Sequence, residues 1–270
     1  MPELPEVETV VRALRPLLNG RSFTEIRNYW PRHIDRPTFA ELQQRLHGRC
    51  ISKLSRRGKY ILIHLDDGQT LIVHLRMSGH LAVVDAAVAP DKHVHTIFGL
   101  DNGQELRFRD PRKFGRVYLV NDVEQVVGKL GPEPLEDDFT VDVLRVCIGS
   151  RKRQLKPMLL EQTIIAGIGN IYADEALFHA KLLPTRRANT LTDVDIVALH
   201  AAIQHVLKTG IEREGASIDT YIKPDGEKGD MQNAVMVFRR TGQPCYSCGT
   251  PIERIILSQR STHFCPNCQK

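Results

Sequence analysis

The 270-residue sequence contains no apolar run close to the length of about 18–20 residues that a membrane-spanning helix requires. Its first residues are acidic, whereas a secretory signal peptide starts with basic residues and continues with an apolar stretch. No internal repeat or low-complexity tract is present, which excludes repeat architectures. We therefore expect a soluble, cytoplasmic protein that has no membrane partner.

Cysteine is scarce, and four of the six cysteines lie near the C-terminus in two C-x2-C pairs sixteen residues apart. These are Cys245, Cys248, Cys265 and Cys268. In a reducing compartment such pairs favour a metal over disulfides, and the spacing matches a tetrahedral site of four thiolates. We predict one structural Zn²⁺, with a disulfide pair or a chance pattern as the alternatives. The other two, Cys50 and Cys147, are predicted to be ordinary buried thiols.

Positive charge slightly exceeds negative charge, with 37 lysines and arginines against 32 acidic residues and a net charge of +5. The basic residues form three clusters, at 49–59, 107–116 and 151–156. Any one of these basic clusters could simply belong to an ordinary solvent-exposed surface. Three clusters and a basic C-terminal region together indicate a surface that binds a polyanion.

The N-terminal residues combine proline and glutamate in the order Met1-Pro2-Glu3-Leu4-Pro5-Glu6-Val7-Glu8. If Met1 is removed, Pro2 carries a secondary α-amine, which titrates at about pH 8 and is partly unprotonated at neutral pH. Such an amine can attack a carbonyl-like carbon to form a Schiff base, which stays cationic because the nitrogen has no proton to lose. The alternative is structural, since proline is common at the start of a helix and glutamate in the first turn favours the helix dipole.

Hydrophobic periodicity predicts an α+β fold. An apolar stripe predicts a helix from about Pro5 to Leu18, and it contains Val7, Val10, Val11, Leu14, Leu17 and Leu18. Two hairpins are predicted, one from Tyr60–Leu65 and Thr70–Leu75, the other from His95–Leu100 and Glu105–Arg109. Most of residues 21–120 is therefore expected to form an antiparallel β-sandwich with flanking helices.

The composition changes near residues 131–134, after which the pattern is helical. The predicted helices are Val141–Cys147, Gln154–Thr163, Ile171–Ala180 and Val194–Gly210, and Ala216–Gln232 is predicted to be a loop. A short hairpin with Arg260 near its tip is expected between the cysteine pairs. We accordingly expect three domains, at residues 1–134, 135–238 and 239–270.

Three loops carry residues suited to nucleic acid. The sequence Asp110-Pro111-Arg112-Lys113-Phe114-Gly115 offers cations beside an aromatic ring, and Met77 follows a predicted strand. Phe114 and Met77 could fill the gap left by a base that leaves a duplex, or they could belong to the core. In the third loop, at 165–171, Asn170 is predicted to cap a helix whose N–H groups could bind phosphate, although an ordinary helix hairpin is the alternative.

Seven motifs in this order resemble the formamidopyrimidine-DNA glycosylase family along the whole chain. They are the N-terminal Pro2–Glu8 sequence, Arg57-Gly58-Lys59-Tyr60, His74–Gly79, Lys92-His93-Val94-His95, Asp110–Gly115, Gly167–Tyr172 and the four cysteines. Leu4 is typical of this family, whereas the related endonuclease VIII branch usually has glycine there.

The resemblance implies a bifunctional base-excision enzyme that removes 8-oxoguanine and formamidopyrimidines from duplex DNA and then cleaves the strand by β,δ-elimination. It implies that Pro2 is the nucleophile at C1′, Glu3 the general acid/base and Glu6 a support for the opened sugar. Lys59 is then the proton donor of the lyase steps. Arg260 at the zinc hairpin is then the phosphate clamp of the final elimination.

The resemblance also implies how the DNA is bound. Met77, Arg112 and Phe114 correspond to the residues that fill the vacated base stack, and His93, Arg151, Lys156 and Asn170 to DNA-backbone contacts. Residues 154–180 would form a helix–two-turn–helix motif in the middle domain, followed by a four-cysteine zinc finger. We expect a bacterial enzyme that acts as a monomer and associates with the nucleoid through DNA.

The chain departs from the family pattern at Arg239, where most relatives carry glycine, at Lys113, where arginine is frequent, and in the loop Tyr221–Gln232. Two other functions remain as alternatives. One is a non-catalytic, zinc-dependent DNA-binding protein, which would leave the N-terminal proline and glutamates unexplained. The other is an endonuclease VIII-like glycosylase for oxidised pyrimidines.

Overall fold

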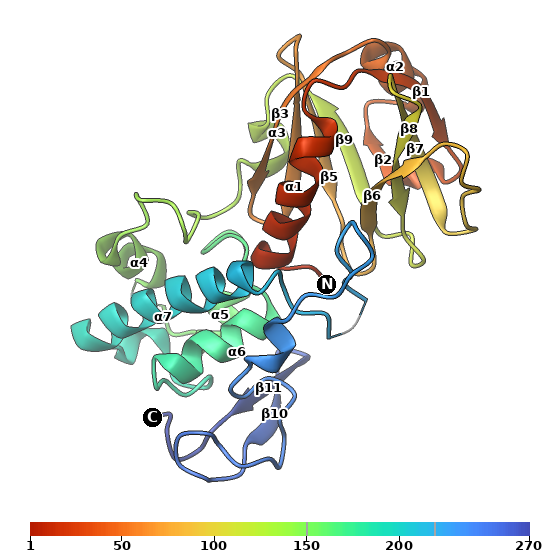
Figure 1. Cartoon of the computed structure of the whole chain (residues 1–270). Helices are drawn as coiled ribbons and strands as arrows, with labels where there is room; N and C mark the ends of the chain where they lie inside the picture. The colour runs from red at the N-terminus through yellow and green to blue at the C-terminus, as the bar shows by residue number, and fades with distance from the viewer. Residues whose placement is uncertain (150, 219) are drawn as a thin grey trace. The chain divides into compact units, whose positions relative to one another are not determined.

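The computed structural model of this chain describes residues 1–149, 151–218 and 220–270 (Figure 1). The chain forms two compact units. The first contains Met1–Lys129 and Glu214–Asp230, and the second contains Leu130–Arg213 and Met231–Lys270. These two units are defined by the contacts between residues. The three domains expected from the sequence are defined by their functions, and that organisation stays a prediction.

The first unit begins with helix α1, Leu4–Leu18, close to the predicted range. Glu3 is its N-cap and forms a capping box with Glu6, while proline occupies the first turn, where a missing N–H costs no hydrogen bond. All residues of the predicted stripe are buried except Leu17, which is 43% exposed. Leu17 lies at the edge of the stripe, one turn beyond Leu14, so the stripe is narrower than expected.

Two sheets form the body of this unit, as the sequence predicts. One has the order β1 (Phe23–Asn28), β7 (Val94–Leu100), β8 (Gln104–Arg109), β6 (His80–Asp85). The other has the order β2 (Ile34–Arg36), β9 (Arg116–Val120), β5 (Thr70–His74), β4 (Tyr60–Leu65), β3 (Ile51–Arg57). Both predicted hairpins are present, and pairing is antiparallel except between β2 and β9, which are parallel.

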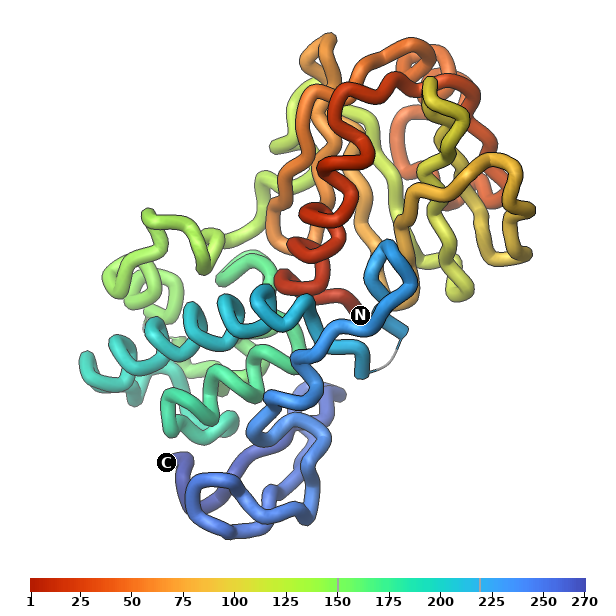
Figure 2. The backbone as a smooth tube through the Cα atoms, in the orientation of Figure 1, coloured from red at the N-terminus to blue at the C-terminus, as the bar shows by residue number. Residues whose placement is uncertain are grey.

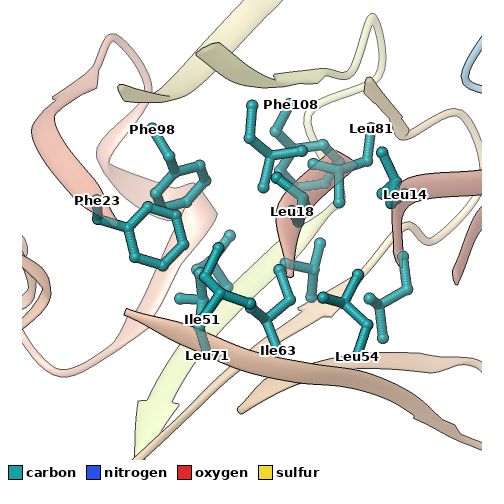
Figure 3. Close-up of a cluster of buried hydrophobic side chains, with 14 of the residues drawn as sticks. Leu14, Leu18, Phe23, Ile51, Leu54, Ile63, Leu71, Leu81, Phe98 and Phe108 are labelled. Atoms are coloured by element: carbon teal, nitrogen blue, oxygen red, sulfur yellow. The ribbon is translucent and has the colours of Figure 1, made fainter. Parts of the chain in front are cut away.

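The core of the first unit lies between the two sheets and α1 (Figure 3). Leu14 and Leu18 of α1 meet side chains from both sheets, and the rings of Phe23 and Phe98 lie 5.8 Å apart. Figure 3 shows these rings side by side at one end of the cluster. The sandwich is therefore held by one continuous apolar layer, with α1 packed along it.

Helix α2, Phe39–Leu46, was not predicted from the periodicity. It begins with a capping box between Thr38 and Glu41, and this threonine–glutamate spacing is a signal that could have located it. The unit also contains the short 3₁₀ helix η1, Pro31–His33, and the short helix α3, Glu124–Val127.

The second unit is helical, as expected. Its elements are α4 (Val141–Ile148), α5 (Leu155–Leu159), α6 (Asn170–His179), η2 (Ala188–Thr190), α7 (Asp193–Glu212) and η3 (Met231–Asn233). Helix α5 is shorter than predicted because the chain turns after Leu160, and η3 lies partly within the expected loop. Among the described residues, no helix has both the length and the apolar character needed to span a bilayer.

The C-terminal hairpin pairs β10 (Glu253–Leu257) with β11 (Arg260–Phe264). Its two turn residues, Ser258 and Gln259, both have positive φ, as tight hairpin turns require. Arg239 also has a positive φ, +58°, which is the left-handed region that favours glycine. This conformation is a physical reason for the glycine expected at this position in relatives.

Candidate active site and DNA-contacting residues

The start of α1 is buried, apart from Met1. Met1 is 45% exposed, Pro2 is buried, and Glu3 and Glu6 are 3% and 1% exposed. The Glu3 N–H donates to Glu6 Oε2 at 2.7 Å. The Glu6 carboxylate is thus held at the N-terminus of α1, where the helix dipole favours negative charge.

Glu6 is also held by the segment 214–230, of which residues 214–218 and 220–230 are described and lie beside the start of α1 in Figure 2. The Ala216 N–H donates to Glu6 Oε1 at 2.8 Å. A Cβ at Gly215 would lie 2.8 Å from Glu6 Cγ, and Gly215 has a φ of +83°. Burial, and then the charge of Glu6, raise the pKa of Tyr221 well above its usual value. The segment therefore fixes both the position and the surroundings of Glu6.

Lys59 lies in the two-residue turn between β3 and β4 and is 5% exposed. Burial, and then the charges of Arg76 and Lys59, lower the pKa of His74 to about 3. His74 Nδ1 accepts a hydrogen bond from the Arg76 N–H at 2.9 Å. His74 is consequently neutral at physiological pH.

The three residues expected to fill a vacated base stack are exposed. Met77 is 37% and Phe114 48% exposed, so the alternative that they belong to the core is wrong. The guanidinium carbon of Arg112 lies 5.2 Å from the Phe114 ring centroid, within the range of a cation–π contact. His93 is half-buried, and its carbonyl accepts from the Asp110 N–H at 2.8 Å.

A cavity of about 500 Å³ opens beside these loops within the first unit. Its lining includes Ser78 and Arg112 from the two loops, and Thr220, Ile222 and Gly226 from the segment 214–230. The Thr220 hydroxyl donates to the Met77 carbonyl at 3.0 Å. Residues distant in sequence thus meet around the exposed Met77.

In the second unit, Arg260 is exposed beside the hairpin turn, where it was expected. Asn170 is the first residue of α6 and not its cap, which is Gly169, so this expectation was wrong. The Asn170 side-chain amide instead donates to the Ser261 carbonyl at 3.1 Å. Asn170 is thereby joined to the residue next to Arg260.

Lys156 is fully buried, unlike the other expected DNA-backbone contact nearby, Arg151, which is exposed. Lys156 Nζ lies 2.7 Å from Asp174 Oδ1 and donates to the Ser261 carbonyl at 2.6 Å. Asp174 Oδ2 in turn accepts from the His263 N–H at 3.0 Å. Lys156 and Asp174 thus tie α5 and α6 to Ser261 and His263 of β11.

Asp174 and Glu175 are both buried, although acidic residues early in a helix are ordinarily exposed partners of the helix dipole. Glu175 accepts hydrogen bonds from the backbone N–H groups of Met236, Val237 and Phe238 at 2.7–3.0 Å. Burial outweighs these bonds and raises the pKa of Glu175 to about 7. Two acidic residues inside an otherwise apolar helix are the signal that could have identified this internal role.

The four C-terminal cysteines form a metal site. Their sulfur atoms all lie within 4.8 Å of one another, and Cys245–Cys268 and Cys248–Cys265 are 3.9 and 3.5 Å apart. Zinc–sulfur bonds of about 2.3 Å in a tetrahedron place sulfur atoms about 3.8 Å apart. The geometry fits one structural Zn²⁺, as predicted, and four protein ligands leave no open position for a substrate. Cys50 and Cys147, expected to be buried thiols, are half-buried.

Comparison with known proteins places the whole chain in one family. The pattern of the formamidopyrimidine-DNA glycosylase N-terminal domain matches residues 1–117, and that of its H2TH domain matches residues 130–222. The zinc finger found in FPG and IleRS matches residues 242–270.

Curated relatives and solved structures agree with this assignment. A formamidopyrimidine-DNA glycosylase of Herpetosiphon aurantiacus is 48% identical and one of Protochlamydia amoebophila is 44% identical, each over the full length of both chains. A Lactococcus lactis FPG variant, solved with a DNA containing Fapy-dG, has a TM-score of 0.93, 38% identity and full coverage of both chains. MutM (FPG) of Thermus thermophilus has a TM-score of 0.90 and 38% identity, over 99% of this chain and 98% of that one. The chain therefore belongs to the formamidopyrimidine-DNA glycosylase family, which is a family of DNA-repair enzymes with glycosylase and AP lyase activity.

Proposed function

We propose that this protein removes oxidised purines from duplex DNA through a Schiff base on Pro2 and then cleaves the strand by β,δ-elimination. The observation that carries the proposal is the buried start of α1, where Pro2, Glu3 and Glu6 lie together and Glu3 is hydrogen-bonded to Glu6. Relatives solved with DNA containing Fapy-dG or carbocyclic 8-oxo-G support the substrate class.

In the first step, the Pro2 nitrogen forms a bond to C1′ of the damaged nucleotide. The bond from C1′ to the base breaks, and its electron pair leaves with the base. The Pro2 nitrogen then gives up its proton, and opening of the C1′–O4′ bond produces a cationic iminium while O4′ takes a proton. Glu3 is adjacent to Pro2 in the chain, so we assign the proton transfers at this stage to Glu3. We assign to Glu6, which is held by the Ala216 N–H, the role of supporting the opened sugar.

The iminium withdraws electrons from C2′ and so makes its protons acidic. Transfer of a C2′ proton to water breaks the bond from C3′ to its phosphate oxygen, and the phosphate leaves with the electron pair. Transfer of a C4′ proton to water next breaks the bond from C5′ to the second phosphate, which leaves in the same way. We assign the proton donor of these lyase steps to Lys59 and the phosphate clamp of the last step to the exposed Arg260. The zinc site supports this hairpin as a folded unit and supplies no open ligand position.

A base inside a duplex has to be extruded before this chemistry, which costs a few kcal/mol of unstacking. Insertion of Met77, Arg112 and Phe114 into the gap would offset that cost, since all three are exposed. We further propose that His93, Arg151, Lys156 and Asn170 act at the DNA backbone, Lys156 through its contacts with Ser261 and Asp174. The enzyme would act as a monomer in the bacterial cytoplasm.

Borohydride trapping on an 8-oxoguanine duplex tests the proposal. We expect a covalent protein–DNA adduct at Pro2, weaker trapping with Pro2→Gly, and an intact mass that lacks Met1. Tight DNA binding without an adduct would instead favour a non-catalytic DNA-binding protein. Faster excision of thymine glycol than of 8-oxoguanine would favour an endonuclease VIII-like substrate range. Full activity in protein that retains Met1 would overturn the Pro2 mechanism.

A further inference from the structure

We infer that Asp110 is a positioning residue that joins the Met77 loop and the Arg112–Phe114 loop into one rigid insertion element, with Ser78 as the link between them. This inference rests on the proposed function, in which these loops enter the DNA. It adds a buried residue that makes no contact with DNA but sets the spacing of the residues that do.

The carboxylate of Asp110 bonds to both loops. Its Oδ1 accepts from the Ser78 hydroxyl at 2.6 Å, and its Oδ2 accepts from the Gly115 N–H at 2.7 Å. The Arg112 N–H is shared, at 3.3 Å from both Asp110 Oδ1 and Ser78 Oγ. Ser78 follows Met77 directly, Gly115 follows Phe114 directly, and Arg112 is itself one of the insertion residues. One fully buried side chain is therefore bonded at or next to each of the three insertion residues.

Asp110 also lies close to the buried side chain of His33. His33 Nε2 lies 3.6 Å from Asp110 Oδ2, and both side chains are fully buried. Burial alone would raise the pKa of Asp110, but the nearby His33 and the hydrogen bonds from Ser78 and Gly115 outweigh burial and lower the pKa to about 2. The group is thus a permanent anion whose hydrogen bonds belong to the stronger, charge-assisted class.

The two loops also pack against the same apolar side chain, that of Phe108. A Cβ on Gly79 would lie 2.7 Å from Phe108 Cε2, and a Cβ on Gly115 would lie 2.3 Å from Phe108 Cζ. The absence of a side chain at each glycine therefore lets its loop approach the ring of Phe108. This ring stacks on that of His33, with the two ring centroids 4.7 Å apart. Both loops are located by the same ring and the same carboxylate.

The backbone of each loop is strained at the residue just before its exposed apolar side chain. Arg76 precedes Met77 with a φ of +54°, and Lys113 precedes Phe114 with a φ of +61°. Residues other than glycine adopt this conformation only where the surroundings fix it, and such strain is concentrated at functional sites. The hydrogen bonds of Asp110 supply that constraint, so we expect the insertion residues to relax when these bonds are lost.

A double-mutant cycle tests the inference through single-turnover excision of 8-oxoguanine. Ser78→Ala removes the link between the loops and leaves the bonds of Asp110 to Arg112 and Gly115. In the wild-type background we expect Ser78→Ala to lower the excision rate about tenfold, which is the scale of one hydrogen bond to a charged group. In the Phe114→Ala background we expect Ser78→Ala to lower the rate by less than about twofold. Asp110→Asn should show the same pattern. Equal losses with and without Phe114→Ala would overturn the inference, since a general folding defect would be additive.

A second readout follows the DNA. With 2-aminopurine opposite a tetrahydrofuran abasic analogue, the wild-type enzyme should change the fluorescence on insertion, and Ser78→Ala should reduce the change at saturating protein. An unaltered change would overturn the inference. Asp101→Asn, an exposed carboxylate in the β7–β8 turn, is the matched control and should leave rate and fluorescence unchanged. If Phe114→Ala alone had no effect, the insertion role and this inference would both fail, while trapping would still report on Pro2.

Discussion

Lys156 Nζ lies 2.7 Å from Asp174 Oδ1, and both side chains are fully buried. Burial of two charges costs several kcal/mol per ion, and this cost is recovered only when each charge keeps its partner and further hydrogen bonds. The Ser261 carbonyl and the His263 N–H supply those bonds from β11, so the ion pair connects the helices to the strand that starts with Arg260.

Replacing Lys156 with methionine should destabilise the protein by about 3–5 kcal/mol, because an uncompensated charge would remain on Asp174. Lys156→Met with Asp174→Asn should recover part of this loss, and urea denaturation measures both. Lys152→Met, an exposed cation nearby, is the control and should change stability by less than about 0.5 kcal/mol. If Lys156→Met left stability intact and lowered the salt dependence of DNA binding as Lys152→Met does, Lys156 would be a direct phosphate contact instead.

Glu175 should make the second unit less stable as pH rises. Burial raises the pKa of this carboxyl from 4.5 to about 7. Below pH 4.5 the group is protonated in both the folded and unfolded states. Between pH 4.5 and 7 the unfolded chain releases the proton while the folded chain keeps it, so the group's contribution to stability falls, and above pH 7 it stays constant.

The comparison with Glu175→Gln isolates this effect, because the other titrating groups are the same in both proteins. The free energy of unfolding of the wild type, relative to the variant, should fall from pH 5 to pH 7 in urea denaturation. A relative stability that rises over this range would mean that the three backbone N–H groups stabilise the carboxylate more than burial destabilises it.

The sequence predicts the parts of this fold whose signal is local. Apolar spacing located α1, the alternating runs on either side of short turns located the hairpins, and two C-x2-C pairs located the metal site. The periodicity of α2 was too weak over eight residues, although its capping box was present. Leu17 was misplaced because one residue at the edge of a stripe can face either way.

Long-range partners were beyond the sequence alone. The acidic pair inside the apolar helix α6 is a sign that Asp174 is buried, but nothing local identifies Lys156, eighteen positions earlier, as its partner. Asp110 is hydrogen-bonded to Ser78, thirty-two positions away, and the sequence around neither residue indicates that the two are partners. The exposure of Met77 and Phe114 follows from these tertiary contacts, which explains why the core and the surface were equally compatible with the pattern.

Loss of zinc should unfold the hairpin and weaken DNA binding. Structural zinc contributes on the order of 10 kcal/mol in small zinc modules, far more than two short strands can supply. Cys248→Ser should therefore lower the zinc content from one ion per chain and remove hydrogen-exchange protection at residues 253–264. Cys50→Ser, which changes a cysteine outside the four-thiolate cluster, should retain both. Tight binding to a lesion duplex after loss of the metal would contradict a role of the hairpin in DNA binding.

Glu3→Gln should abolish base release and spare DNA binding. The amide keeps the size of the side chain and leaves the Glu3 N–H bonded to Glu6, but it cannot exchange protons. Loss of one general acid/base costs about 10²–10⁴-fold in rate, whereas the dissociation constant for a tetrahydrofuran duplex should change less than about twofold. Glu8→Gln is the matched control, because Glu8 lies one turn further along α1 and forms ion pairs with Arg12 and Arg56. Single-turnover excision of 8-oxoguanine separates the two variants, and an unchanged rate with Glu3→Gln would remove Glu3 from the proton transfers.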